Sequence, residues 1–237
     1  MYTFEGKVRY SEVDRTGKLP APGIINYFQD CSVFQSEELG VGVKYLLSQN
    51  RAWMLCSWQV IFEKFPKEGD FVATSTWASG FERIHGIRNF TMRDKDGELF
   101  AYANSYWVYM DVEAGKPIRA SQEEVDTYKP ETPFPMENAS RKIKVPKDLD
   151  WTDTHPVKVQ KSWIDSNQHV NNNRYIYVAW NALSKEPKLR QIRVEYKKAA
   201  KLGDMIIPKV ATFENKIFVS LCDEIQKPYA VVEITIG

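Results

Sequence analysis

The feature that most constrains the fold of this sequence is an internal repeat. Residues 10–19 align without gaps over residues 161–170, and each segment leads from a strand-like run into an apolar run of helical period. Farther along, residues 59–70 align over residues 193–204, and both stretches begin as strands and end in a Gly-Asp turn. One order of elements that occurs twice in 237 residues predicts a duplicated domain.

The first copy is predicted to contain one long helix and an antiparallel sheet. Residues 2–10 form a strand, and apolar residues from Ile24 to Leu39 recur at helical spacing, with Pro22 near the first turn and Gly40 past the end. Strand-like runs follow at residues 52–64, 70–79, 83–93 and 98–111. A helix held against a curved antiparallel sheet fits this order.

The second copy repeats this order. Residues 157–163 are strand-like, a polar turn follows, and a helix extends to about Leu183. Further strands are predicted at residues 191–199, 204–213, 216–222 and 229–236. The fold class is therefore α+β, with two domains in tandem.

Proline is concentrated between the two copies. It occurs at positions 117, 130, 133, 135, 146 and 156, which is the composition of a linker, although residues 121–128 favour a short helix. We therefore predict an N-terminal domain at residues 1–115, a linker at 116–155 and a C-terminal domain at 156–237.

Composition excludes several classes of function. The chain has 32 Lys and Arg against 31 Asp and Glu, so its overall charge does not favour nucleic acid. Cys31, Cys56 and Cys222 are odd in number and far apart, which predicts no disulfide framework and no metal site, and no cofactor is expected. No signal segment or membrane span is apparent. We expect a cytoplasmic protein.

The turn at the start of the second helix carries the candidate site. It places an acid, an amide and an imidazole at alternate positions, namely Asp165, Asn167 and His169. Taken alone, this string before a helix is typical of an Asx-turn and a helix cap. The first copy has Thr16 and Lys18 at the last two positions, although its helix needs a cap too. This asymmetry favours a functional site, at a helix N-terminus suited to developing negative charge.

The string from Asp165 to Asn172 resembles a motif of the acyl-acyl carrier protein thioesterases, found in bacterial members and in the plant plastid enzymes. Segments of the first half agree with the same family at residues 9–14, 26–30, 52–55 and 65–70. The resemblance covers nearly the whole chain. It implies a tandem double hot-dog fold, each half a long helix wrapped by an antiparallel sheet. It also implies hydrolysis of acyl carrier protein thioesters to free fatty acid in fatty acid biosynthesis.

The resemblance makes Asp165, Asn167 and His169 the catalytic residues. Hydrolysis needs an activated water and donors for the oxyanion. His169 would deprotonate the water, and Asn167 and the helix amides would act as the donors. The family also uses a carboxylate where this chain has Ala199. Asp165 therefore either orients its neighbours or itself serves as base or nucleophile. We favour water attack assisted by His169 and Asp165, with Glu195 as a fallback acid.

The resemblance also implies an apolar slot for the acyl chain in the first domain. Trp53, Met54, Trp58 and Phe28 are candidate walls, and each is equally compatible with ordinary core packing. Acyl carrier protein is acidic, so a local basic surface is needed to bind it. The candidate cations are Arg174, Lys185, Lys188, Arg190, Arg193, Lys197, Lys198 and Lys201. Arg174 would also meet a phosphate of the pantetheine arm.

Two alternatives remain open from the sequence. One is a thioesterase that acts on acyl-CoA. The other is a non-catalytic acyl-binding hot-dog protein, which the missing carboxylate at Ala199 favours. A tandem pair satisfies internally what single hot-dog units obtain by dimerising, so both a monomer and a homodimer are compatible with the sequence.

Overall fold

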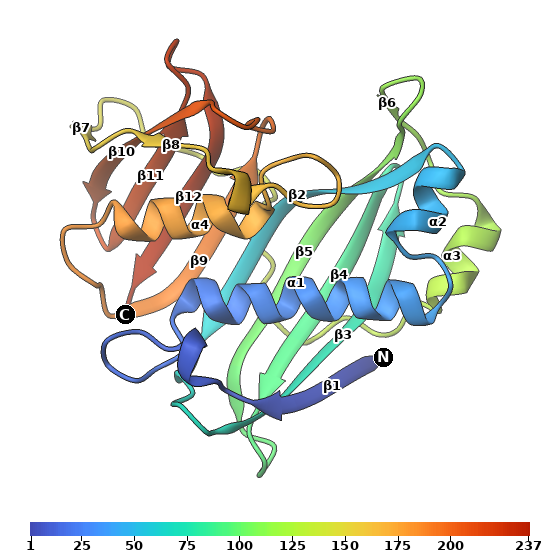
Figure 1. Ribbon diagram of the computed structural model, residues 1–237. Helices are drawn as coiled ribbons and strands as arrows, with labels where there is room; N and C mark the ends of the chain where they lie inside the picture. The colour runs from blue at the N-terminus through green and yellow to red at the C-terminus, as the bar shows by residue number, and fades with distance from the viewer. The chain divides into compact units, whose positions relative to one another are not determined.

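The computed structural model describes residues 1–237 and divides into two compact units. The first contains residues 1–56 and 60–139, and the second contains residues 57–59 and 140–237. Each unit has one main helix that lies across antiparallel strands (Figure 1). The predicted combination of a helix and an antiparallel sheet in each half is therefore confirmed.

The sheet of the first unit has the strand order β1-β3-β4-β5-β2. These strands are β1 (Tyr2–Lys7), β2 (Arg51–Phe62), β3 (Phe71–Glu82), β4 (His85–Arg93) and β5 (Leu99–Asp111). A short strand, β6 (Lys116–Pro117), pairs with β5. The remaining elements are the single turn η1 (Tyr10–Glu12) and the helices α1 (Ala21–Glu38), α2 (Val43–Ser48) and α3 (Gln122–Tyr128).

Helix α1 forms where the apolar spacing predicted it. Pro22 occupies the first turn, where its missing N–H would have no helical partner, and Gly40 adopts a φ of +73° just beyond the end. Phe28 is fully buried and its ring lies 5.3 Å from that of Phe90 on β4. Since side chains alternate along a strand, Phe90 identifies the face of β4 that supports α1.

The second unit repeats this plan with the strand order β9-β12-β11-β10-β7. Its strands are β7 (Thr152–Asp153), β8 (Val157–Lys158), β9 (Leu189–Tyr196), β10 (Met205–Phe213), β11 (Lys216–Cys222) and β12 (Pro228–Ile236). Strand β8 pairs with β10. A single turn, η2 (Lys161–Trp163), precedes helix α4 (Asn172–Asn181), as η1 precedes α1. No helix of the chain has the length and apolar character needed to cross a membrane.

Three predicted boundaries of the second half are wrong. The run 157–163 is extended only as far as Lys158, because its end folds into η2. Helix α4 ends at Asn181, where the amide of Leu183 bonds back to the Trp180 carbonyl and tightens the final turn. Strand β9 ends before residue 197, because two successive amides, those of residues 197 and 198, share the carbonyl of Tyr229.

The proline-rich segment makes specific contacts in both units. In the first, the indole of Trp77 donates to the Thr132 carbonyl (3.0 Å), and the Phe134 amide donates to the Asn89 side chain (3.1 Å). In the second, Ile143 packs with Phe218 and Val231. Residues 129–151 thus cover the sheet faces that point away from the helices.

Candidate active site

Residues 165–169 form a tight turn that is built on the Asp165 carboxylate. Its Oδ1 accepts hydrogen bonds from the amides of Asn167 (2.8 Å) and His169 (3.3 Å). The Asp165 amide donates to the His169 carbonyl (2.9 Å), and the Gln168 amide donates to the Asp165 carbonyl (3.1 Å). Gln168 has a φ of +62°, an unfavourable region for a residue with a side chain.

The matching turn of the first unit has the same hydrogen bonds. Asp14 Oδ1 accepts from the amides of Thr16 (2.7 Å) and Lys18 (3.4 Å), and the Asp14 amide donates to the Lys18 carbonyl (2.8 Å). Gly17 occupies the left-handed position with a φ of +72°. The aspartate is therefore a structural residue of the turn in both units, and the units differ in the side chains that the turn presents.

In the second unit those side chains are an amide and an imidazole. Asn167 and His169 are exposed, and neither side chain has a hydrogen-bond partner within the chain. In the first unit, by contrast, the Thr16 hydroxyl donates to the Asp14 carboxylate (2.7 Å). Asp165 thus positions its two neighbours through their backbone amides and not by a bond to either side chain. The turn therefore leaves an amide and an imidazole available to a ligand.

Helix α4 starts just after this turn. Asn171 is its N-cap, and its side-chain oxygen accepts from the amide of Asn173 (2.9 Å). The Asn171 amide donates to the Trp163 carbonyl (2.8 Å), which fixes the entry of the helix against η2. The first-turn amides of a helix attract negative charge, so an oxyanion near His169 would lie in a favourable field.

The loop after β9 runs beside the His169 turn. The Ala200 carbonyl accepts from the Val170 amide (3.4 Å), and the Ala200 amide donates to the Tyr175 hydroxyl of α4 (2.7 Å). Burial raises the pKa of Tyr175 to about 12, so this hydroxyl stays neutral. Ala199 precedes Ala200 and is exposed. The position where the resembling family carries a carboxylate therefore adjoins the candidate site, and here it holds a methyl group.

The alternation argument for Glu195 as a fallback acid is wrong. It needs an extended chain from residue 195 to residue 199, and β9 ends at Tyr196. Glu195 Oε2 accepts from the Ile143 amide (3.0 Å) and its Oε1 pairs with Lys197 (3.0 Å). These contacts belong to the sheet face that the connecting segment covers, away from α4.

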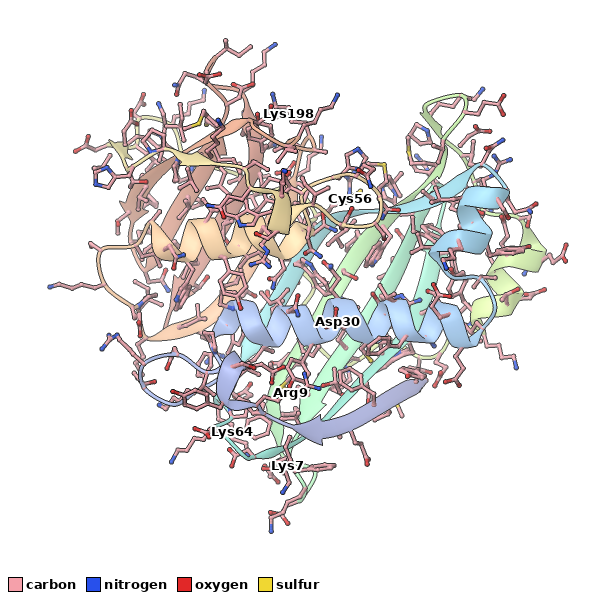
Figure 2. The ribbon with its side chains drawn as sticks, in the orientation of Figure 1. Lys7, Arg9, Asp30, Cys56, Lys64 and Lys198 are labelled. Atoms are coloured by element: carbon pink, nitrogen blue, oxygen red, sulfur yellow. The ribbon has the colours of Figure 1, made fainter.

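One residue of the predicted basic surface is buried in the interior. Arg193 is buried and pairs with the buried carboxylate of Glu233 (3.0 Å), so it is unavailable to a partner. Lys198 pairs with Asp223, and this hydrogen bond holds the pKa of Asp223 below its usual range. Figure 2 labels Lys198 in the second unit, just after the end of β9.

Other predicted cations have no ion pair. Lys201 and Arg174 are exposed, and the Arg174 guanidinium lies 6.0 Å from the ring centre of Tyr177. The remaining exposed cations without an acidic partner are Lys185, Lys188 and Arg190. The positive charge available to a partner therefore comes from α4, from the start of β9 and from the loops on either side of it.

The predicted acyl walls do not share one environment. Trp53 lies in an aromatic group, with its ring 4.4 Å from that of Tyr109 and 6.0 Å from that of Phe81. Met54 is 44% exposed, and Trp58 is buried. Because neighbouring strand side chains alternate, Met54 lies on the face of β2 opposite Trp53. A single slot on one face of β2 is therefore lined by Trp53 without Met54.

Comparison with models of known protein families identifies the family of this chain. A model of the acyl-ACP (acyl carrier protein) thioesterase N-terminal domain matches residues 1–128, and a model of the C-terminal domain matches residues 147–233. The chain belongs to the acyl-ACP thioesterase family. The second match contains the whole turn with Asp165, Asn167 and His169.

Several plant proteins are similar to this chain. Oleoyl-acyl carrier protein thioesterase 2 of Arabidopsis thaliana, a chloroplast protein, is 28% identical over 167 residues, which are 65% of this chain and 46% of that protein. The palmitoyl-acyl carrier protein thioesterase of the same plant is 24% identical over 207 residues, covering 81% of this chain and 50% of that protein. This acyl-ACP thioesterase family member spans about half the length of these relatives.

Solved structures share the fold. An acyl-ACP thioesterase from Bacteroides thetaiotaomicron superposes with a TM-score of 0.87 at 24% identity and covers 98% of this chain and 96% of its own. The 12:0-ACP thioesterase of Umbellularia californica gives 0.86 at 16% identity, covering 99% and 96%. At these identities the likeness establishes the fold, which is the predicted tandem double hot-dog.

Proposed function

We propose that this chain hydrolyses acyl-ACP thioesters and releases free fatty acid. The observation that carries the proposal is the difference between two equivalent turns. Both are held by an aspartate, and only the later one presents an unpartnered amide and imidazole, on Asn167 and His169, at the start of a helix. Membership of the acyl-ACP thioesterase family supports the same reaction.

In the proposed mechanism His169 is the general base. Its imidazole takes a proton from a water molecule as that water attacks the thioester carbonyl, so no covalent acyl-enzyme forms. The C–S bond of the tetrahedral intermediate then breaks, and the imidazolium gives its proton to the departing thiolate of the carrier. Asn167 donates a hydrogen bond to the developing oxyanion, together with amides at the start of α4. Asp165 holds both residues in place through their backbone amides, and its negative charge stabilises the imidazolium that forms.

The acidic carrier protein is proposed to bind at the unpaired cations around the site. Arg174 and Lys201 lie on the helix and the loop beside the turn, and both are exposed. Lys197 and Lys198 already have acidic partners, so they contribute less. Arg174 is also proposed to contact a phosphate of the pantetheine arm. Pairs between exposed charges weaken with salt, so carrier binding is expected to be salt-sensitive.

The acyl chain is proposed to occupy the domain predicted at residues 1–115, between α1 and the sheet. Trp53 and Phe28 are the predicted wall residues that face this interface. Gly86, a neighbour of Trp53, carries no side chain, and a Cβ there would come within 3.2 Å of the Trp53 ring. This close packing fixes the indole plane, which suits a rigid wall better than a flexible side chain would.

A second candidate function is acyl binding with little turnover. The specific observation that favours it is Ala199, which adjoins the turn and supplies no carboxylate where the family motif has one. In that case the site would hold an acyl carrier through Asn167 and the cations without an efficient base.

Hydrolysis of a purified acyl-ACP, followed by free fatty acid release, tests the proposal. His169→Ala is expected to lower kcat by ~10²–10⁴-fold, which is the rate enhancement that a general base usually provides. Lys18→Ala is the matched control, because Lys18 occupies the equivalent position of the first turn and should leave kcat unchanged. An active parent with an equally active His169→Ala variant would falsify the site. A parent that binds acyl-ACP without turnover supports the second candidate instead.

A further inference from the structure

The first unit buries a guanidinium that has no acidic partner. Arg88 lies on β4 with 8% of its surface exposed. It donates to the Gln35 side chain of α1 and, from the same nitrogen, to the Thr76 hydroxyl of β3 (3.3 Å). No aspartate or glutamate forms an ion pair with it, and burial lowers its pKa. An Arg side chain has five N–H donors, so most of its hydrogen-bonding capacity is not used within the chain.

The guanidinium lies inside the interface between α1 and the sheet. Its contact with Gln35 places it near the C-terminal end of α1, whereas Phe28 and Phe90 pack nearer the other end. The Tyr128 ring lies 5.6 Å from it, and that ring contacts Trp53 at 6.3 Å. The interface is therefore apolar at one end and, at the other, cationic and bordered by aromatic rings.

The fold does not require this charge. In the second unit the corresponding face beneath α4 is apolar on every strand that can be compared, with Val194, Val219 and Val232 all buried. A buried charge without an opposite partner is costly, and apolar residues of similar volume usually stabilise a core better. On β3, the buried Thr74 hydroxyl has no hydrogen-bond partner either. Hydrogen-bonding groups of this interface that have no partner within the chain point to contact with a ligand.

We propose that Arg88, held by Gln35 and Thr76, forms the end wall of the acyl site in the first unit and so selects the shorter acyl chains. This inference rests on the proposed function, in which the acyl chain lies between α1 and the sheet. A methyl end that stops before the guanidinium contacts the aromatic rings and the apolar part of the interface. A longer chain must press methylene groups against a desolvated cation, which cannot interact favourably with them.

The test is a chain-length profile of kcat/KM on short-, medium- and long-chain acyl-ACP. Arg88→Met keeps most of the side-chain volume and removes the charge. We expect it to raise the ratio of long-chain to short-chain kcat/KM by about 10-fold or more, the discrimination associated with one or two methylene groups. Arg88→Lys keeps a cation and should retain the parental profile.

Controls separate this inference from a folding defect. Arg93→Met removes another guanidinium from β4, one that donates to the Gly97 carbonyl (2.7 Å) at the hairpin, and should leave the profile unchanged. If Arg88→Met does not fold, Arg88→Gln tests the same point, because it keeps a donor toward Gln35 and Thr76 without the charge. An unchanged profile in a folded neutral variant overturns the inference.

Failure of the proposed function gives a different result. In that case the parent hydrolyses no acyl-ACP, and chain-length preference is measured by binding of free fatty acids of the same lengths. A neutral variant that then binds longer fatty acids than the parent supports the end wall. Identical binding profiles overturn it.

Discussion

Asp14 and Asp165 make the same backbone hydrogen bonds in the two units, yet the turns that they hold present different chemistry. The first presents Thr16, whose hydroxyl donates a hydrogen bond to the aspartate carboxylate. The second presents Asn167 and His169 with no internal partner. A duplicated fold thus keeps the residue that shapes the turn and is free to vary the side chains at the tip.

The interfaces between helix and sheet also differ between the two units, and here the first unit is the more polar one. Beneath α4 the sheet is apolar, and the buried Arg193 and Glu233 of the second unit are paired on the other face. Beneath α1 lie Arg88 and Thr76, joined to the helix through Gln35. The sheet face beneath the helix is therefore apolar in the second unit, whereas in the first it carries buried polar groups. In the proposed function, the second unit carries out the reaction and the first unit selects the acyl chain.

The strongest test of this comparison within the turns is a matched pair of substitutions. Asn keeps a side-chain oxygen that accepts from backbone amides, so Asp165→Asn and Asp14→Asn should both preserve their turns. Asp165→Asn removes the charge beside the proposed imidazolium, and we expect kcat to fall by about 10-fold or more, equivalent to ~1.4 kcal/mol of transition-state stabilisation. Asp14→Asn should leave kcat unchanged. Equal effects of the two substitutions on fatty acid release would show that the aspartate acts only on the fold.

A smaller effect is expected at the missing carboxylate. By the repeat, Ala199 of the second unit corresponds to Phe65 of the first, so neither copy has an acid there. Ala199→Glu adds one beside His169 and should raise kcat by a few-fold up to about 10-fold if the imidazole gains an orienting partner. Ala199→Gln is the control, because it has similar size and no charge. If both variants show parental kcat, Asp165 already provides the negative charge that the reaction uses.

The smallest expected effect concerns acid stability of the first turn. Burial raises the pKa of Asp14, but hydrogen bonds from the Thr16 hydroxyl and amide and from the Lys18 amide outweigh it and leave the pKa lowered. A carboxyl with a lowered folded-state pKa stabilises the protein above its ordinary pKa, and this stabilisation is lost as pH falls through the folded value. Urea midpoints of the parent and Asp14→Asn should therefore differ most near neutral pH and converge in acid. A gap that stays constant with pH would contradict this role.

Local patterns predicted the parts of the chain that depend on local forces. Helix α1 followed from apolar spacing between Ile24 and Leu39, with Pro22 and Gly40 at its ends, and the turn followed from the string around Asp165. The same patterns failed where one long-range contact changed the backbone. Strand β9 ends early because the Tyr229 carbonyl, more than thirty residues away, binds two successive amides.

The sequence also did not show which charged side chains are buried. The basic neighbours of Arg193 in the chain predict a surface cation, whereas the structure pairs Arg193 with Glu233 in the interior. In the sequence Arg88 is one charged residue of a predicted strand, and only its burial makes it a candidate for substrate selection. Burial depends on which strands become neighbours, and a single strand does not contain that information.

The sequence by itself determined that one unit occurs twice and that only the later copy places an amide and an imidazole before its helix. The tertiary structure decided what the aspartate before them does, which cations remain available, and where a charge is enclosed without an acidic partner. The reason is physical. Period and turn chemistry act over a few residues, whereas desolvation and ion pairing depend on groups that only folding brings together.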